Sequence, residues 1–397
     1  MPPPWPEPVA VMIGGLGQGG SERQLYSFLA GCDRRRWEPL VFASGALGFW
    51  EAPIRALGIP VVLLQGNPLA KMRQFRTAVA AAGIRCFFSW SSYTNGYALA
   101  LAGTGSHCIG SFRNAQFADL PHRLRCLWIW VSLAGLTAVV CNSAETQAQV
   151  ARQCSPRLRV VFVPNAVEVP PSELVAAWRD HWRKRLGLSL DTVLVLGAGR
   201  LVPQKCFSRF IDVIAQVIQR HGQAVYAVIA GEDHGCLPAL QAHVAQLGLV
   251  GRIEFLGAVP DARELMAAAD IFLLSSDYEG MPNVVLEAMA AGVPCVATPV
   301  NGLGGVIESG SSGLVAEAEA SDLAQHVAML AADSGLRQAM GARGRARIAT
   351  NHQPDRIIRG LWALCEAQAK PSMGDASAAS DIRRPGFLAR RRRDVHR

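Results

Sequence analysis

Short apolar segments alternate with longer amphipathic segments along most of this 397-residue chain, and the alternation comes in two series. The first series runs from the apolar segment at 9–14 to the one at 159–167, and the second runs from 192–199 to 313–317. Short apolar segments followed by helical patterns are typical of parallel strands joined by crossover helices. We therefore predict an α/β fold with two Rossmann-like, doubly wound parallel-sheet domains. Two such domains facing each other leave a central cleft, and ligands bind beyond the carboxyl ends of parallel strands.

The domain boundaries follow from where the two series begin and end. A chain of this length, of which 50% is hydrophobic, suits two domains with separate cores. We predict an N-terminal domain at 1–172, a linker at 173–190, a C-terminal domain at 191–350, a C-terminal helix at 351–370 and a disordered basic tail at 371–397.

The net charge indicates which class of partner the protein binds, and the cysteine content indicates its cellular compartment. The net charge of +8 favours phosphate-bearing or other anionic partners. Part of it lies in the arginine-rich tail, for which plain solvation and attraction to a membrane surface are the two interpretations. We predict no nucleic-acid partner, because the tail has one aromatic residue and no recognisable module. The ten cysteines include no C-x2-C pair, and the N-terminus lacks an export pattern, so we expect a reducing, cytoplasmic location.

A glycine-rich loop follows the first apolar segment. Residues 15–20 match G-x-G-x-x-G, a pattern found between the first strand and helix of dinucleotide-binding domains. That fingerprint needs an acidic residue at the end of the next strand, but this strand ends in Ser44 and Gly45. The dehydrogenase hypothesis therefore loses its second indicator. What remains is a loop whose glycines, including Gly17 and Gly19, form either a tight turn or a phosphate cradle at a helix N-terminus.

Two cations follow the first apolar segment of the second series. The sequence GAGRLVPQK at 197–205 ends a predicted strand in Gly-Ala-Gly and continues into Arg200 and Lys205. A guanidinium offers a planar fork of donors and an ammonium a point charge, and phosphate oxygens suit both. These two side chains are candidates for binding a diphosphate, although arginine and lysine are also common on ordinary surfaces.

Two glutamates with seven residues between them occupy a loop and the following helix. Glu279 falls in the predicted loop at 277–282, and Glu287 falls inside the predicted helix at 283–292. The amides around 280–284 form a helix N-terminus, which attracts an anion. Carboxylates beside an anion site are useful when they accept hydrogen bonds from hydroxyls, and a nucleotide sugar offers both phosphate and hydroxyls. The alternative for Glu287 is an ordinary helix residue with a capping or salt-bridging role.

The segment EGMPNVVLEAMAAGVPCVAT at 279–298 closely resembles the E-x7-E motif of glycosyltransferase family 4, whose members are retaining enzymes with the GT-B fold. Four other segments resemble family motifs in the same order, so the likeness covers nearly the whole chain. They are GGLGQGGSERQL, VCNSAETQAQV, VPNAVE and the diphosphate segment GAGRLVPQK. FLGAVPDARELMAAADIFLLSS is similar to the family segment beside the nucleoside.

The resemblance implies transfer of a sugar, with retention, from a nucleotide-diphosphate sugar to an acceptor hydroxyl, in polysaccharide or glycolipid assembly. The N-terminal domain would bind the acceptor and the C-terminal domain the donor. Matching motifs give Arg200 and Lys205 the diphosphate, Glu287 the ribose hydroxyls and Glu279 the donor sugar. The predicted catalytic residues are Glu279, Arg200, Lys205 and Arg113. The predicted donor-binding residues are Gly17, Gly19, Arg200, Lys205, Glu279, Gly280, Met281, Pro282, Asn283 and Glu287.

The sequence departs from the family pattern in three places. Cys206 follows Lys205 where a glycine is frequent, and Gly305 stands where a glutamate is usual. The stretch GSFRNAQF brings Arg113 and Asn114 to the region where many members have a histidine near the reacting carbon. His107 and His122 lie nearby in the sequence and are minor candidates for that role. These departures concern the acceptor and the donor sugar rather than the fold.

We expect neither a metal nor a cofactor, with the nucleotide sugar acting as substrate. The sequence has no D-x-D motif and no cluster at metal-ligand spacing. A double displacement through paired carboxylates is not expected, because Glu287 is better used on ribose. The family is argued to react from the front face, with the leaving phosphate helping to deprotonate the acceptor. The alternatives are a sugar-nucleotide epimerase or phosphorylase-like enzyme on the same fold, a dehydrogenase, and a catalytically degenerate partner of another transferase.

An apolar stretch with basic neighbours suggests contact with a membrane. The apolar run at 126–141 is too short to span a bilayer, and its end resembles a strand. At 120–136, His122, Arg123 and Arg125 accompany Trp128 and Trp130, a composition typical of an interfacial helix. We therefore predict reversible binding to an anionic membrane surface and a sugar or lipid-linked acceptor. The alternative is a helix that packs on its own sheet, with both tryptophans in the core.

Overall fold

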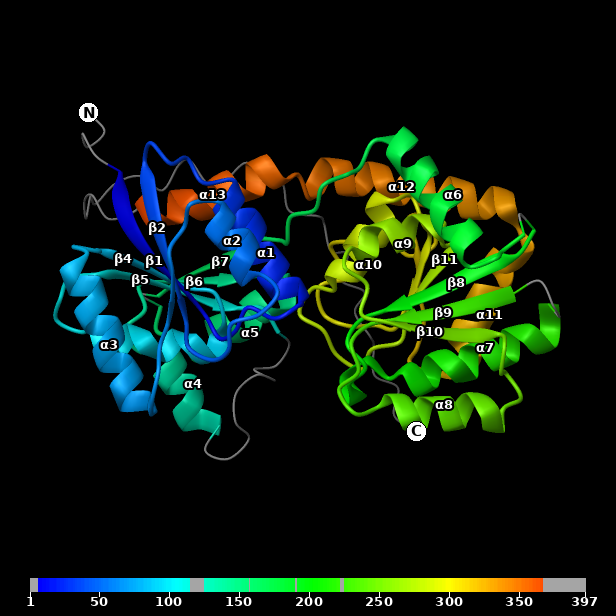
Figure 1. Cartoon of the computed structure of the whole chain (residues 1–397), viewed down its shortest axis with the longest axis horizontal. Helices are drawn as coiled ribbons and strands as arrows, with labels where there is room; N and C mark the ends of the chain where they lie inside the picture. The colour runs from blue at the N-terminus through cyan, green and yellow to red at the C-terminus, as the bar shows by residue number, and fades with distance from the viewer. Residues whose placement is uncertain (1–5, 115–124, 157, 190, 222–224, 367–397) are drawn as a thin grey trace, which may run out of the picture.

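The computed structural model describes residues 6–114, 125–156, 158–189, 191–221 and 225–366. Within them, two parallel sheets lie side by side, each between layers of helices (Figure 1). The N-terminal sheet has the order β3-β2-β1-β4-β5-β6-β7 and the C-terminal sheet the order β10-β9-β8-β11-β12-β13. The predicted α/β architecture with two doubly wound domains is confirmed.

The N-terminal strands are β1 (Glu7–Ile13), β2 (Trp37–Ala43), β3 (Val61–Leu63), β4 (Cys86–Ser89), β5 (His107–Phe112), β6 (Ala138–Cys141) and β7 (Arg159–Phe162). The elements between them are α1 (Gly20–Ala30), α2 (Glu51–Ala56), α3 (Pro68–Ala81), the 3₁₀ helix η1 (Ser92–Leu101), α4 (Arg125–Leu133) and α5 (Ala144–Gln153). Strands β4, β5 and β6 are buried at every position, as expected of parallel strands covered on both faces.

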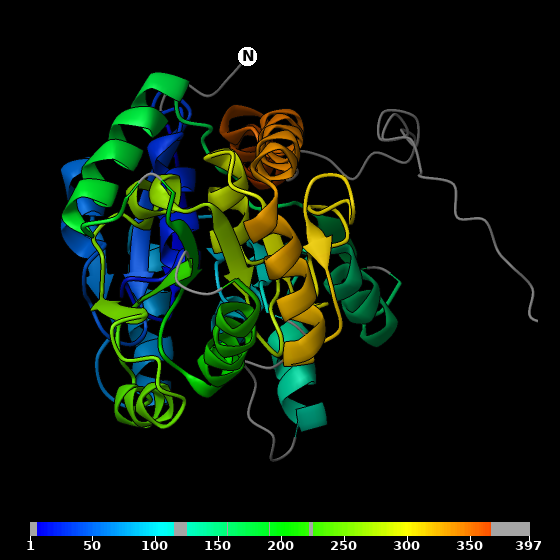
Figure 2. The same cartoon turned by 90° about the vertical axis from the view of Figure 1, so that its right-hand side faces the viewer.

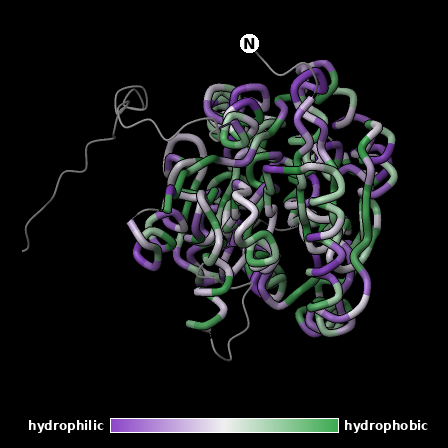
Figure 3. The backbone as a smooth tube through the Cα atoms, turned by 90° about the vertical axis from the view of Figure 1, so that its left-hand side faces the viewer, coloured by the Kyte–Doolittle hydropathy of each residue, from purple (hydrophilic) through white to green (hydrophobic). Residues whose placement is uncertain are grey.

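The C-terminal strands are β8 (Val193–Ala198), β9 (Val225–Ala230), β10 (Ile253–Gly257), β11 (Ile271–Leu274), β12 (Cys295–Ala297) and β13 (Leu314–Val315). The helices are α6 (Ser172–Arg185), α7 (Phe207–His221), α8 (Leu237–Gln246), α9 (Ala262–Ala268), α10 (Asn283–Ala290), α11 (Ala320–Ala332), α12 (Ser334–Asn351) and α13 (Pro354–Glu366), with a 3₁₀ turn η3 at Pro203–Lys205. Along the tube in Figure 3, hydrophobic and hydrophilic segments alternate, as the sequence pattern requires.

Both sheets reverse their strand order at one point, and this reversal places the candidate loops. In the N-terminal sheet β1 lies between β2 and β4, and in the C-terminal sheet β8 lies between β9 and β11. The loops that leave such neighbouring strands diverge to opposite faces and open a crevice at the carboxyl edge. The glycine loop follows β1, the Arg200 loop follows β8, and the Glu279 loop follows β11. The three loops therefore meet between the domains.

The chain crosses between the two domains twice. The apolar segment 159–167 forms a strand only to Phe162, because Pro164 lacks an amide hydrogen and the chain then turns towards the C-terminal domain. Helix α6, which begins one residue before the predicted linker 173–190, packs on the C-terminal domain. There Trp182 joins the core, while Arg179 and Arg183 bind Asp270 at 2.5 and 3.0 Å.

The last described helix returns to the N-terminal domain. Trp362 of α13 stacks on Phe28 with ring centroids 4.2 Å apart, and the ring of His107 contacts the carbonyl of Leu364 at 2.9 Å. Helices α12 and α13 lie along one edge of the molecule in Figure 1 and are seen end-on in Figure 2. The predicted C-terminal helix thus completes the core of the other domain, and the predicted tail at 371–397 lies outside the described residues.

Helix α4 presents apolar side chains to solvent. Leu127, Trp128 and Trp130 are 51%, 42% and 64% exposed, whereas Ile129 and Leu133 pack towards the core. The alternative that both tryptophans lie in the core is therefore wrong. The predicted strand at the end of this apolar stretch is present as β6. Among the described residues, none of the helices combines the length and the apolar character that crossing a bilayer requires.

Candidate active site in the interdomain cleft

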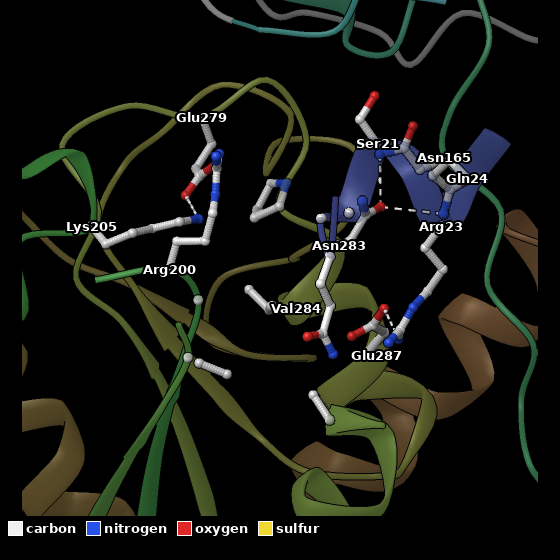
Figure 4. Close-up of a pocket in the computed structure, with 18 of the residues that line it drawn as sticks. Ser21, Arg23, Gln24, Asn165, Arg200, Lys205, Glu279, Asn283, Val284 and Glu287 are labelled. Atoms are coloured by element: carbon white, nitrogen blue, oxygen red, sulfur yellow. Dashed lines mark hydrogen bonds and ion pairs between the residues drawn. The ribbon is translucent and has the colours of Figure 1, made fainter. Parts of the chain in front are cut away.

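A cavity between the two domains contains most of the predicted site residues (Figure 4). From the C-terminal domain its lining includes Arg200, Lys205, Glu279, Gly280, Met281, Pro282, Asn283 and Glu287. From the N-terminal domain its lining includes Gly19, Arg113 and Asn114, together with Arg23 and Asn165. Gly17 is exposed in the loop ahead of α1 and is not part of this lining, so its contact with a donor stays a prediction.

The N-termini of α1 and α10 meet across the cavity. A side chain at Gly20 would come within 2.5 Å of Asn283 Nδ2, and one at Gly280 would collide with the carbonyl of Arg113 at 2.0 Å. Glycine at these two positions therefore permits the close approach of the domains. Helix N-termini carry unpaired amides and partial positive charge, so two of them facing one cavity form a site for an anion.

Lys205 and Glu279 form an ion pair inside the cavity. Lys205 Nζ lies 2.5 Å from Glu279 Oε1, and the Ser276 hydroxyl donates to the same oxygen at 2.7 Å. Their side chains are 15% and 10% exposed, so both are largely buried. Gln204, next to Lys205, donates to the carbonyl of Tyr278 at 2.7 Å and ties the loops after β8 and β11 together. The two predicted residues are thus brought into direct contact.

Cys206, the first departure from the family pattern, adopts a left-handed backbone conformation with φ of 46°. Among the described residues it is the single non-glycine with positive φ. This conformation is easy for glycine and strained for a residue with a Cβ, which explains why glycine is frequent there. Cysteine keeps the turn, because the Cys206 amide donates to the carbonyl of Pro203 at 3.0 Å.

Glu287 is buried and paired with an arginine of the opposite domain. Arg23 on α1 donates to Glu287 Oε1 at 2.9 Å, and Glu287 is 7% exposed. Burial raises the pKa of Glu287, whereas Arg23 and Arg263 act to lower it. The salt-bridging alternative for Glu287 is therefore present in the structure, and ribose binding stays a prediction. Sequence reasoning missed Arg23; its place in the first turn of the helix after the glycine loop was the available clue.

Asn165 links the crossing segment to the cavity. Its amide donates to Asn283 Oδ1 at 2.8 Å, and Gln24 donates to the same oxygen at 3.3 Å. Gln24 also bonds both backbone groups of Ala166, at 2.7 and 2.9 Å, and the His352 ring bonds the carbonyl of Asn165 at 2.8 Å. Sequence reasoning recognised this segment as a family motif but did not assign Asn165 to the site.

Arg113 is a desolvated cation on the N-terminal side of the cavity. Its guanidinium lies 3.8 Å from the ring centroid of Trp90, and Nη1 donates to Asn165 Oδ1 at 3.3 Å. Burial lowers the pKa of Arg113 to about 9, which leaves it charged at neutral pH. Its Nε is buried without a hydrogen-bond partner in the described part of the chain. A buried donor of this kind is costly unless a ligand satisfies it.

The remaining candidates lie apart from the cavity or outside the described residues. His107 bonds the Leu364 carbonyl and the Thr137 hydroxyl at 2.9 and 2.6 Å, and burial lowers its pKa, so its position is structural. His122 and Arg123 fall outside the described residues. At Gly305 a side chain would meet open space, and Glu145 of the other domain accepts from the amide of Gly302 at 3.2 Å. The described residues contain no group of three or more acidic, cysteine or histidine side chains able to hold a metal.

Two facing Rossmann-like domains with a charged cleft between them define the GT-B fold, which is shared with solved glycosyltransferase structures. Anabaena Alr3699/HepE in complex with UDP-glucose superposes with a TM-score of 0.80 at 19% identity, covering 91% of this chain and 99% of that chain. WaaG, a glycosyltransferase involved in lipopolysaccharide biosynthesis, superposes with a TM-score of 0.72 at 17% identity, covering 89% and 99%. These likenesses establish the fold.

Residues 179–347 match the family model described as glycosyl transferases group 1. The lipopolysaccharide core biosynthesis glycosyltransferase LpsE of Rhizobium meliloti is 32% identical over 163 residues, 41% of this chain and 46% of that protein. A D-inositol 3-phosphate glycosyltransferase of Geodermatophilus obscurus is 30% identical over 304 residues, 72% of this chain and 64% of that protein. The aligned regions thus span from about half to just under two thirds of these relatives. The C-terminal half of the chain is similar to group 1 glycosyl transferases, and glycosyltransferase is the class of enzyme that the comparisons support.

Proposed function

We propose that this protein is a retaining glycosyltransferase that moves a sugar from a nucleotide-diphosphate sugar to an acceptor hydroxyl, in polysaccharide or glycolipid assembly. The arrangement of charge in the cleft carries the proposal. Lys205 and Arg23 are neutralised by Glu279 and Glu287, whereas Arg200 and Arg113 have no carboxylate at ion-pair distance among the described residues. Among the described residues the lining holds four cations against three carboxylates, the third being Glu232, so its net charge is positive and suits a diphosphate.

The polar groups of the cavity divide between phosphate and hydroxyls. Arg200, Lys205 and the N-terminus of α10 would bind the diphosphate, with the amides of 280–283 facing its oxygens. Glu279 would accept from hydroxyls of the donor sugar, and Glu287 from those of ribose. Names of relatives support a nucleotide-sugar donor and a role in polysaccharide or glycolipid assembly, because HepE was solved with UDP-glucose and LpsE is a lipopolysaccharide core biosynthesis glycosyltransferase.

This placement, together with the resemblance to the family, supports a front-face reaction. The acceptor oxygen forms a bond to the anomeric carbon as the bond to the phosphate oxygen breaks, and the acceptor proton passes to the leaving diphosphate. Negative charge grows on that diphosphate, and fixed cations and amides already aimed at it lower the barrier. Arg113, stacked on Trp90 at 3.8 Å, would stabilise this charge from the acceptor side. Attack and departure on the same face give retention.

The proposal is tested by incubating the purified protein with UDP-, GDP- and ADP-sugars and a panel of acceptors. We expect one donor to be consumed, with a product of the same anomeric configuration by NMR. Net epimerisation without transfer would favour the epimerase alternative. Failure of every nucleotide to bind would favour the catalytically degenerate partner.

Chelation is expected to leave activity largely intact. The reason is that Arg200, Lys205, Arg113 and two helix N-termini supply the positive charge that a divalent ion supplies to other transferases. Donor consumption should be measured after dialysis against EDTA and again after adding Mg²⁺ or Mn²⁺. Inactivation by EDTA with recovery on metal addition would contradict this part of the mechanism.

A lipid-linked acceptor accounts for the exposed apolar face of α4. Leu127, Trp128 and Trp130 are all more than two fifths exposed, and such side chains enter the acyl boundary of a membrane. Basic residues that neighbour this helix in the sequence would add attraction to anionic lipid of about 1 kcal/mol each. We expect the protein to float with anionic liposomes at low salt and much less at high salt.

The test variant is the double change Trp128→Ser/Trp130→Ser. The control is Leu174→Ser, which removes an exposed leucine from α6, a helix of the other domain. The double variant should lose most of the floated fraction, and the control should keep it. A further truncation of 371–397 tests the predicted contribution of the basic tail. Wild type that stays unbound at low salt, or a double variant without the tail that floats like wild type, would contradict membrane binding through this face.

A further inference from the structure

The contact between Arg23 and Glu287 joins the two domains at the nucleoside end of the cleft. Arg23 comes from the first turn of α1, and Glu287 from the second turn of α10. One carboxylate oxygen, Oε1, is bound at 2.9 Å, and in Figure 4 the other oxygen is directed away from Arg23. Beside this contact, Gln18 donates to the carbonyl of Val259 at 3.0 Å, which also holds the domains together.

Several other charges face Glu287. Arg23 is also 3.9 Å from Asp261, which caps α9 and is bound by Arg263 at 2.6 Å. Arg263 approaches Glu168 of the crossing segment at 3.5 Å. Arg345 of α12 donates to the carbonyl of Ala290, at the other end of α10. Among the ion pairs of the described residues, Arg345 is not a partner of Glu287. Arg23 is therefore the cation in direct contact with Glu287.

We propose that Arg23 is the positioning residue for Glu287, fixing the rotamer and the charge of this carboxylate so that its second oxygen accepts hydrogen bonds from ribose. The inference rests on the proposed function. Because Arg23 belongs to the N-terminal domain and Glu287 to the C-terminal domain, the ribose site is complete only when the domains are closed. Donor binding is thereby linked to closure of the cleft.

The physical reason is the cost of burying Glu287. A carboxylate that is 7% exposed tends to take up a proton, and a protonated carboxyl is a weaker acceptor for hydroxyl groups. Burial raises the pKa of Glu287, and the first opposing influence is Arg23. Ribose binding therefore requires the charged form of Glu287. It is present above the pKa of Glu287 and is lost as the pH falls through that pKa. Removing Arg23 raises that pKa further and moves the loss to higher pH.

The experiment measures UDP, GDP and ADP affinity by calorimetry between about pH 5 and pH 8. The variants are Arg23→Met, Arg23→Lys, Glu287→Gln and the double Arg23→Met/Glu287→Gln. Arg36→Met is the control, because Arg36 is half-exposed and pairs with Glu366, a residue of α13. The difference between wild type and Glu287→Gln separates Glu287 from the titration of the ligand phosphate.

We expect Glu287→Gln to weaken binding at neutral pH by roughly 10- to 100-fold, the usual weight of hydrogen bonds to a charged group. As the pH falls, Arg23→Met should lose nucleotide affinity at a higher pH than wild type does. Arg23→Lys should move the pH dependence part of the way back to that of wild type. The double variant should have the same affinities as Glu287→Gln. Melting curves check that each variant is folded.

Each outcome bears on the proposal separately from the enzyme class. An Arg23→Met profile with the wild-type midpoint, or tighter binding than wild type, would show that Arg23 is neutral or blocks Glu287 and would overturn the inference while leaving the glycosyltransferase intact. A wild-type protein that binds none of the three nucleotides would overturn both.

Discussion

Replacing Lys205 with alanine will reduce donor turnover by about 10²–10³, the usual effect of removing one preorganised donor from a site that stabilises developing negative charge. Lys205 lies in the cavity 2.5 Å from Glu279, so its loss also leaves a buried carboxylate facing the diphosphate. Repulsion between these anions adds to the loss of the cation. The rate should be measured as nucleotide release at saturating donor, together with the melting temperature.

Two further variants separate catalysis from stability. Lys205→Ala/Glu279→Gln removes the uncompensated carboxylate and should recover stability without recovering most of the rate. Lys184→Ala removes a lysine of an exposed pair on α6 and should leave both quantities unchanged. Turnover by Lys205→Ala within about an order of magnitude of wild type would contradict the assignment of Lys205 to the diphosphate.

The position of the site could be predicted because it depends on topology. Glu279, Arg200 and Lys205 follow β11 and β8, neighbouring strands on the two sides of the order reversal, and each has a residue type suited to phosphate or hydroxyls. Strand–helix alternation determines which loops reach the carboxyl edge. Their meeting in one cavity therefore follows from the order of elements, before any side-chain contact is known.

The contacts that cross the cleft could not be predicted in the same way. Arg23 sits in an ordinary first turn, and nothing local to the sequence says that Glu287 lies opposite, 264 residues later. The stacking of Arg113 on Trp90 differs, because it joins the ends of the neighbouring strands β5 and β4 of one sheet. Asn165 does reach across, and its amide donates to Asn283 of the C-terminal domain at 2.8 Å. Such pairs depend on how two rigid surfaces dock, and local propensity carries no information about docking.

The assignment of helices α6 and α13 to a domain could not be predicted from the sequence either. The sequence predicts a linker over most of α6 and a separate C-terminal helix over α13, since each lies outside the strand–helix series. Each is buried against a domain from which the sequence alone would separate it. Trp182 of α6 joins the C-terminal core, and Trp362 of α13 joins the N-terminal core.

Trp362→Ala is accordingly expected to destabilise the N-terminal domain by about 3–5 kcal/mol, the usual cost of emptying a large buried aromatic site. Trp362 is 4% exposed, stacks on Phe28 at 4.2 Å, and donates from Nε1 to the Phe28 carbonyl at 3.1 Å. Truncation leaves a cavity between α1 and α13 and removes that donor. Urea unfolding gives the free-energy change, and hydrogen exchange shows which amides lose protection.

The location of the lost protection decides which domain α13 stabilises. With Trp362→Ala, amides of β1, β2 and β4 should exchange faster, while those of β8 and β11 keep their rates, because the emptied site lies in the N-terminal core. Trp128→Ala is the matched control, since an exposed tryptophan contributes within about 0.5 kcal/mol. Loss of protection in the C-terminal sheet instead would place α13 with the domain that precedes it in the sequence. Loosening of α13 should also weaken donor binding, because His352, just before α13, holds the Asn165 carbonyl at 2.8 Å beside the cavity.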